Sequence, residues 1–159
     1  MSPETSYTLP VDSILLLGPT GVGKSPLGDV IARRGLFGRR CHHLDFGSEL
    51  RDAVTRTDRS GAYTKSELDL IHAVLEGGLL LENEHFPLAE KIITLYLERV
   101  AFSKQDLLVL NGIPRHKGQA NDIATMARVH LIIVLDCSPD VVQDYQPASV
   151  RDKYRILCE

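Results

Sequence analysis

The feature that most restricts how this chain can fold is the segment GPTGVGKS, residues 18–25, which matches the pattern G-x-x-x-x-G-K-[ST]. Its glycines can adopt positive φ and let the backbone approach a phosphate closely. Successive N–H groups of such a loop surround phosphate oxygens, and the helix that follows offers the positive end of its dipole. The motif follows an apolar run, which is the context that it requires. The sequence therefore predicts a strand, a phosphate-binding loop and a helix, in that order.

This loop predicts the binding of a nucleoside triphosphate. Lys24 is expected to reach the β- and γ-phosphates, and the Ser25 hydroxyl to bind Mg²⁺. Proline at position 26 is compatible with this reading, because a first helical turn accepts proline. The residues expected to bind ATP are Gly18, Pro19, Thr20, Gly21, Val22, Gly23, Lys24, Ser25 and Pro26.

Short apolar runs predict the strands of an α/β domain. Residues 14–17, 107–110 and 131–135 form three such runs, and residues 41–46 form a weaker one. Runs without alternation are typical of strands covered on both faces, as in a parallel sheet with helices on either side. The order β-α-β-α-α-α-β-α-β predicts a three-layer domain with a parallel sheet of about four strands.

Helices are predicted between these runs. Residues 64–76 begin with the capping box Thr64-Lys65-Ser66-Glu67, and Gly77-Gly78 ends the helix. Pro87 is expected in the first turn of the next helix. Residues 26–34 and 117–128 are predicted to form shorter helices.

Two further segments each end in an arginine after a predicted strand. Residues 43–51, HLDFGSELR, end in Arg51, and residues 111–115, NGIPR, end in Arg115. The carboxyl edge of a parallel sheet is where open α/β sheets bind ligands. Two planar guanidinium groups suit a monophosphate, since each can make bidentate contacts. Gln119, one helical turn beyond Arg115, carries both a donor and an acceptor and suits the edge of adenine.

These segments, in this order and spacing, resemble the adenylate kinase family. Residues 47–51 are similar to the family's G-D-x-L-R segment, and residues 111–120 to its D-G-F-P-R-x-x-x-Q-A segment. Residues 78–84, GLLLENE, look like its G-x-L-V-x-D-E stretch, whose backbone lines the AMP base pocket. The resemblance covers roughly residues 12–142. It implies a three-layer P-loop kinase fold and reversible, Mg²⁺-dependent phosphoryl transfer from ATP to AMP.

The resemblance also implies roles for individual residues. Lys24, Arg51 and Arg115 would be catalytic, through positioning and charge neutralisation more than acid–base chemistry. The implied domain is residues 1–159, with an AMP-binding helical segment at about 47–78 and a missing or very short lid near 143–149. The AMP-binding residues implied are Phe46, Arg51, Leu79, Leu80, Leu81, Gly112, Ile113, Pro114, Arg115 and Gln119.

The phosphate-binding segments depart from the family pattern at three positions. Ser48 and Asn111 stand where the family usually has acids that orient the waters around Mg²⁺. Losing two negative charges beside a dication is expected to weaken metal placement. Asp45, nearby in sequence, is a candidate for partial substitution. Phe46 replaces a small hydroxyl residue and is expected to narrow or reshape the AMP pocket.

A larger departure follows the fourth predicted strand. Residues 144–149, DYQPAS, contain no arginine where the family has an arginine-bearing lid. Residues 150–157 resemble the helix after the lid, so Arg151 or Arg155 is expected to supply one transition-state cation. The family's fifth strand is expected to be missing. Such arginines are worth on the order of 10³–10⁵ in rate, so their loss would leave binding intact and turnover poor.

Composition excludes several other classes of protein. A chain of 159 residues with a net charge of −3 is not a general polyanion binder, and no nucleic-acid partner is expected. Cys41, Cys137 and Cys158 form neither a disulfide framework nor a zinc site, which fits a reducing compartment. Apolar runs too short to cross a bilayer predict no membrane span. We therefore expect a cytoplasmic monomer whose partners are ATP and AMP and whose cofactor is Mg²⁺.

Two alternative functions stay open at this point. The first is a nucleotide-binding protein of the same fold without phosphoryl transfer, favoured by the missing lid arginines and by Ser48 and Asn111. The second is a kinase for another nucleoside monophosphate, which Phe46 favours and Gln119 disfavours.

Overall fold

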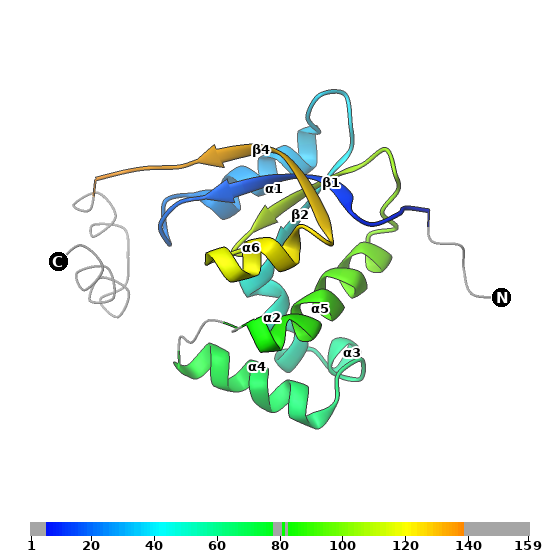
Figure 1. Ribbon diagram of the computed structural model, residues 1–159, viewed down its shortest axis with the longest axis vertical. Helices are drawn as coiled ribbons and strands as arrows, with labels where there is room; N and C mark the ends of the chain where they lie inside the picture. The colour runs from blue at the N-terminus through cyan, green and yellow to red at the C-terminus, as the bar shows by residue number, and fades with distance from the viewer. Residues whose placement is uncertain (1–5, 78–80, 82, 139–159) are drawn as a thin grey trace.

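The computed structural model describes residues 6–77, 81 and 83–138, and within them it contains a four-stranded parallel sheet (Figure 1). The strand order is β2-β3-β1-β4, and each neighbouring pair is parallel. The predicted α/β fold with a parallel sheet is confirmed. The strands are β1 (Val11–Leu17), β2 (Cys41–Asp45), β3 (Leu107–Asn111) and β4 (Ala127–Val134).

Helices flank this sheet on both faces, which gives the predicted three layers. One face carries α1, and the other carries α5 and α6, with α4 farther from the sheet (Figure 1). The helices are α1 (Lys24–Arg34), α2 (Phe46–Thr55), α3 (Thr57–Ser60), α4 (Lys65–Gly77), the 3₁₀ turn η1 (Asn83–His85), α5 (Phe86–Arg99) and α6 (Lys117–Ile123).

The two central strands are buried on both faces, as their continuous apolar runs predict. Along β3, Val109 packs in the cluster that contains Ile31 of α1, whereas Leu108 and Leu110 pack in the cluster on the other face. This division follows from the strand geometry, in which successive side chains point to opposite faces. The buried centre holds the carboxyl ends of β1 and β3 in fixed positions.

The expectation of coverage on both faces is wrong for β4. Leu131, Ile132 and Val134 are 37%, 53% and 67% exposed. The physical reason is that β4 is an edge strand of the described sheet and pairs only with β1 there. An apolar run alone does not distinguish a central strand from an edge strand.

The helix predictions hold best where local capping chemistry is present. The capping box forms reciprocally: Glu67 N–H donates to Thr64 Oγ1 at 3.3 Å, and Thr64 N–H to Glu67 Oε2 at 2.7 Å. Pro87 lies in the first turn of α5, as expected. The helix predicted for 117–128 is too long, because α6 ends at Ile123 and β4 begins at Ala127.

Strand β2 ends at Asp45, one residue before the end predicted for it at Phe46. Asp45 closes β2, and its carboxylate accepts from Ser48 N–H at 3.0 Å, which caps α2 and makes Phe46 the first helical residue. None of the described helices is long and apolar enough to cross a membrane. The lid near 143–149, Arg151 and Arg155 lie outside the described residues.

Candidate functional site

The glycine-rich loop joins β1 to α1 and needs two of its glycines for physical reasons. Gly18 has φ of 141°, and a Cβ there would lie 2.3 Å from the Leu135 carbonyl oxygen. Gly23, with φ of 100°, is the N-cap of α1 and makes no side-chain capping bond. Left-handed backbone at both positions favours glycine. The loop therefore has the strand-loop-helix context that the motif predicts.

Lys24, the first residue of α1, is held at this loop by main-chain carbonyls. Its Nζ donates to Gly18 O at 2.7 Å and to Pro19 O at 2.5 Å. Burial lowers the pKa of Lys24, the positive charge of Arg115 lowers it further, and Asp45 opposes the shift. Lys24, Arg115 and Asp45 are thus close enough to influence one another electrostatically.

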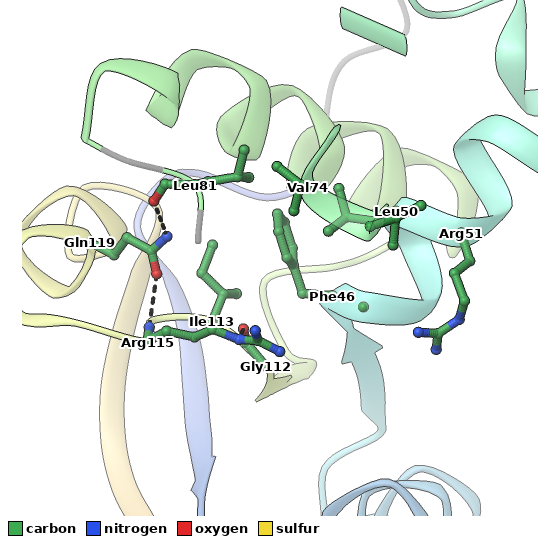
Figure 2. Close-up of a pocket in the computed structure, with 11 residues that line it drawn as sticks. Phe46, Leu50, Arg51, Val74, Leu81, Gly112, Ile113, Arg115 and Gln119 are labelled. Atoms are coloured by element: carbon green, nitrogen blue, oxygen red, sulfur yellow. Dashed lines mark hydrogen bonds between the residues drawn. The ribbon is translucent and has the colours of Figure 1, made fainter. Parts of the chain in front are cut away.

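A cavity of ≈ 180 Å³ is lined by both predicted phosphate-binding arginines (Figure 2). Arg51 reaches it from α2, and Arg115 from the segment between β3 and α6. Its other walls are mainly apolar and come from α2, α4 and the end of β3. The lining residues are Phe46, Gly47, Leu50, Arg51, Val74, Leu75, Leu81, Gly112, Ile113, Arg115 and Gln119.

The two arginines are cations without a carboxylate partner among the described residues. Arg115 Nε donates to the Gly112 carbonyl at 3.1 Å, and the Arg51 guanidinium forms no hydrogen bond within the described part of the chain. Arg51 lies next to Gly47, where a Cβ would be 3.5 Å from Arg51 Nη1 and 3.5 Å from Asp45 Oδ1. Two uncompensated guanidinium groups at one cavity suit an anionic ligand.

Gln119 is buried, and its amide already bridges two backbone segments (Figure 2). Its Oε1 accepts from Arg115 N–H at 2.8 Å, and its Nε2 donates to Leu81 O at 2.7 Å. An amide has two donor hydrogens and two acceptor lone pairs, so one of each is still unused by these bonds. Gln119 therefore positions Arg115 and Leu81 in addition to facing the cavity.

A polar network connects the loop to the ends of β2 and β3. Ser25 Oγ donates to Asp45 Oδ2 at 2.5 Å. Asn111 Nδ2 donates to Ser25 Oγ at 3.0 Å and contacts Asp45 Oδ2 at 3.3 Å and His43 Nε2 at 3.2 Å. The β2–β3 register causes this meeting, because it pairs Asp45 with Asn111. His43 Nδ1 in turn contacts Asp29 Oδ1 at 2.9 Å.

The structure brings most of the residues of the predicted AMP site together. Phe46, Arg51, Leu81, Gly112, Ile113, Arg115 and Gln119 all line the cavity, whereas Pro114 does not. Leu79 and Leu80 lie outside the described residues.

Sequence reasoning missed other residues of this region. Leu50, Val74 and Leu75 line the cavity, and their helical spacing signals only an apolar face. The His43 ring also belongs to this region, because it contacts Asn111 in the network around Ser25. No local pattern reveals this contact, because it depends on the order of the strands.

His116, which follows Arg115 in the chain, is half-buried. Its Nδ1 accepts from Gln119 N–H at 3.3 Å, which caps α6, and its Nε2 lies 3.3 Å from Leu81 O. The ring thus supports the same wall of the cavity as Gln119.

A scan against protein-family models and a search of curated proteins each returned no match for this chain. What is established is an α/β fold with a parallel sheet of order β2-β3-β1-β4 and flanking helices.

Proposed function

We propose that this protein catalyses reversible phosphoryl transfer from ATP to AMP with Mg²⁺, as an enzyme of the adenylate kinase type. The observation that carries the proposal is the presence of two candidate anion sites whose cations, Lys24 and Arg115, influence each other electrostatically. The glycine-rich loop with Lys24 is one, and the cavity with Arg51 and Arg115 is the other. The shared electrostatic influence of Arg115 and Lys24 supports a common space between them.

On the donor side, the loop would hold the triphosphate of ATP. Its N–H groups and the start of α1 would bind the β-phosphate, and Lys24 would exchange its two carbonyl partners for phosphate oxygens. Ser25 Oγ is an oxygen donor of the kind that Mg²⁺ prefers, so the site fits this cation. Bound with ATP, Mg²⁺ would neutralise charge on the β- and γ-phosphates.

On the acceptor side, Arg51 and Arg115 would hold the monophosphate of AMP, and the apolar walls would take its base. An oxygen of this monophosphate attacks the γ-phosphorus, the bond to the β–γ bridging oxygen breaks, and two ADP molecules result. Chemistry of this kind needs aligned reactants and stabilised charge more than a general base. The three cations Lys24, Arg51 and Arg115 supply that charge.

A second candidate is a kinase with another nucleoside monophosphate as acceptor. Phe46 lines the cavity, and the Gln119 amide is partly used by the backbone. Both observations restrict which base edge can be bound. A panel of nucleoside monophosphates, scored by ADP release, separates the candidates: a clear preference for AMP supports the first.

The direct test incubates the protein with ATP, AMP and Mg²⁺ and measures the ADP formed by chromatography of the nucleotides. We expect ADP with the wild type, no detectable ADP with Lys24→Ala, and a severe reduction with Arg115→Ala. Lys117→Ala is the matched control, because Lys117 is exposed at the start of α6 and does not line the cavity. A folded wild-type protein that forms no ADP above buffer would overturn the proposal.

A further inference from the structure

The carboxylate of Asp45 lies beside the loop that we propose to bind polyphosphate. Its Oδ2 accepts from the Ser25 hydroxyl at 2.5 Å, directly beside the loop, and its Oδ1 accepts from Ser48 N–H at 3.0 Å. Asn111 Nδ2 lies 3.3 Å from Oδ2. Among the described residues, these close contacts are all neutral donors, and Asp45 forms no salt bridge there.

The negative charge of a carboxylate at this place would repel a bound triphosphate. The repulsion becomes attraction when a divalent cation lies between the two anions, because the cation interacts favourably with both. Mg²⁺ is usually bound by one or two carboxylates together with substrate phosphates, and it keeps several waters. No group of three or more His, Cys, Asp and Glu residues that could hold a metal occurs in the described ranges. A site shared with the nucleotide fits that finding.

Other carboxylates near the loop or on α2 are less suited to this role. Asp29 is 67% exposed at its side chain and lies at the outer end of the network, against His43. Glu49 is bound by Arg59 at 3.1 Å and by Arg99 at 2.6 Å. Asp45 is therefore the described carboxylate that contacts Ser25 directly and forms no salt bridge within the described structure.

Asn111 is the neutral neighbour of the Asp45 carboxylate, so the pair carries one negative charge. The register places it beside Asp45, and its amide donates to Ser25 and lies within contact of the carboxylate. A carboxylate at both positions would bring two like charges together and raise the pKa of one of them. An amide at one position and an acid at the other give one charge with defined orientation.

We infer that Asp45 is the positioning residue for Mg²⁺ in the Mg·ATP complex, acting beside Ser25 and held in place by Asn111. This inference rests on the proposed binding of ATP. It predicts that the acid and the amide are exchangeable: the charge can sit on β2 or on β3, provided that one carboxylate faces Ser25.

The test is the affinity for ATP, measured by titration calorimetry with excess Mg²⁺ and again with a chelator. Asp45→Asn removes the charge but keeps a good helix N-cap, so α2 is expected to stay capped. We expect this variant to lose about 10- to 100-fold in affinity for Mg·ATP, the usual cost of removing a group that orients a metal's ligands. Its affinity for metal-free ATP is expected to stay equal or to rise, because a repulsive charge is gone.

Rescue and a matched control separate positioning from structural damage. The double variant Asp45→Asn/Asn111→Asp is expected to regain most of the Mg²⁺ effect. Asp69→Asn, at an exposed position of α4 that does not line the cavity, is expected to behave as the wild type. An unchanged Mg²⁺ effect in Asp45→Asn, or no recovery in the double variant, would overturn the role of Asp45 but leave the kinase proposal standing. A wild type that binds ATP under neither condition would instead overturn the proposed function itself.

Discussion

Gly28 packs against the His43 ring, so whether Gly28→Ala stabilises or destabilises the protein is expected to depend on the side chain at position 43. Gly28 is a buried residue within α1, where alanine normally stabilises a helix by about 1 kcal/mol. Here a Cβ would lie 2.4 Å from both Cδ2 and Nε2 of His43. The ring cannot move at little cost, because its side chain is 6% exposed and contacts Asp29 and Asn111.

The size of the stability loss is estimated from the hydrogen bonds that the displaced His43 ring would lose and from the overpacking. Two side-chain hydrogen bonds at about 1 kcal/mol each, together with overpacking of about 1–3 kcal/mol, exceed the gain in helix propensity. After the helix-propensity gain of about 1 kcal/mol is subtracted, we expect Gly28→Ala to lower the free energy of unfolding by about 2–4 kcal/mol. In a His43→Ala background the obstacle is absent, so the same substitution is expected to stabilise by about 1 kcal/mol.

Urea denaturation followed by circular dichroism measures all four proteins of this cycle. We expect Gly28→Ala to destabilise the protein that has His43 and to stabilise the His43→Ala variant. If Gly28→Ala changes stability in the same direction in both backgrounds, the reasoning about this contact is wrong.

Three further perturbations test other parts of the structure. Burial raises the pKa of Asp106, but hydrogen bonds from Arg40, the Ser103 N–H and His42 outweigh it and hold this pKa at about 2, below its ordinary 3.8. The ionised carboxylate therefore stabilises the folded state above about pH 4, and this stabilisation is lost as the pH falls toward 2. Asp106→Asn is therefore expected to cost about 2 kcal/mol at pH 7 in urea denaturation, with a gap to wild type that narrows below pH 4. Arg51→Ala is expected to weaken AMP binding about 10- to 100-fold in calorimetry, because it removes a charge-assisted contact to phosphate. Glu49→Gln is expected to lower stability by about 1–3 kcal/mol, since the carboxylate joins arginines of α3 and α5 to α2.

Each of these predictions has an outcome that contradicts it. A pH-independent difference between Asp106→Asn and wild type would contradict the lowered pKa. Equal AMP affinity of Arg51→Ala and wild type would exclude this arginine from the acceptor site. For Glu49→Gln the control is Glu90→Gln, an exposed position on α5, and equal losses in both would contradict the account.

The parts of the fold that sequence predicts are those with strong local chemistry. The glycine-rich loop, the capping box of α4 and the proline at the start of α5 each define a boundary through nearby residues. The end of α6 was predicted wrongly because long-range pairing decides it. Val11 N–H donates to Met126 O at 2.9 Å, and β1 pairs with Ala127, so the chain becomes a strand where local pattern favours a helix.

The same division applies to the candidate site. Arg51 and Arg115 were expected to converge because both follow parallel strands, and they line one cavity. The network of Ser25, Asp45 and Asn111 could not be predicted in this form, because it requires β2 and β3 to be neighbours in a particular register. Residues that meet through strand order carry no signature in the sequence around them.

The central claim is that the loop and the arginine cavity hold two nucleotides so that a phosphoryl group passes between them. The most direct measurement uses ATP labelled at the γ-phosphate, incubated with AMP, Mg²⁺ and the full chain. The account predicts that the label appears in ADP formed from AMP and that Lys24→Ala abolishes this transfer. Label found only in unreacted ATP or in inorganic phosphate would contradict it.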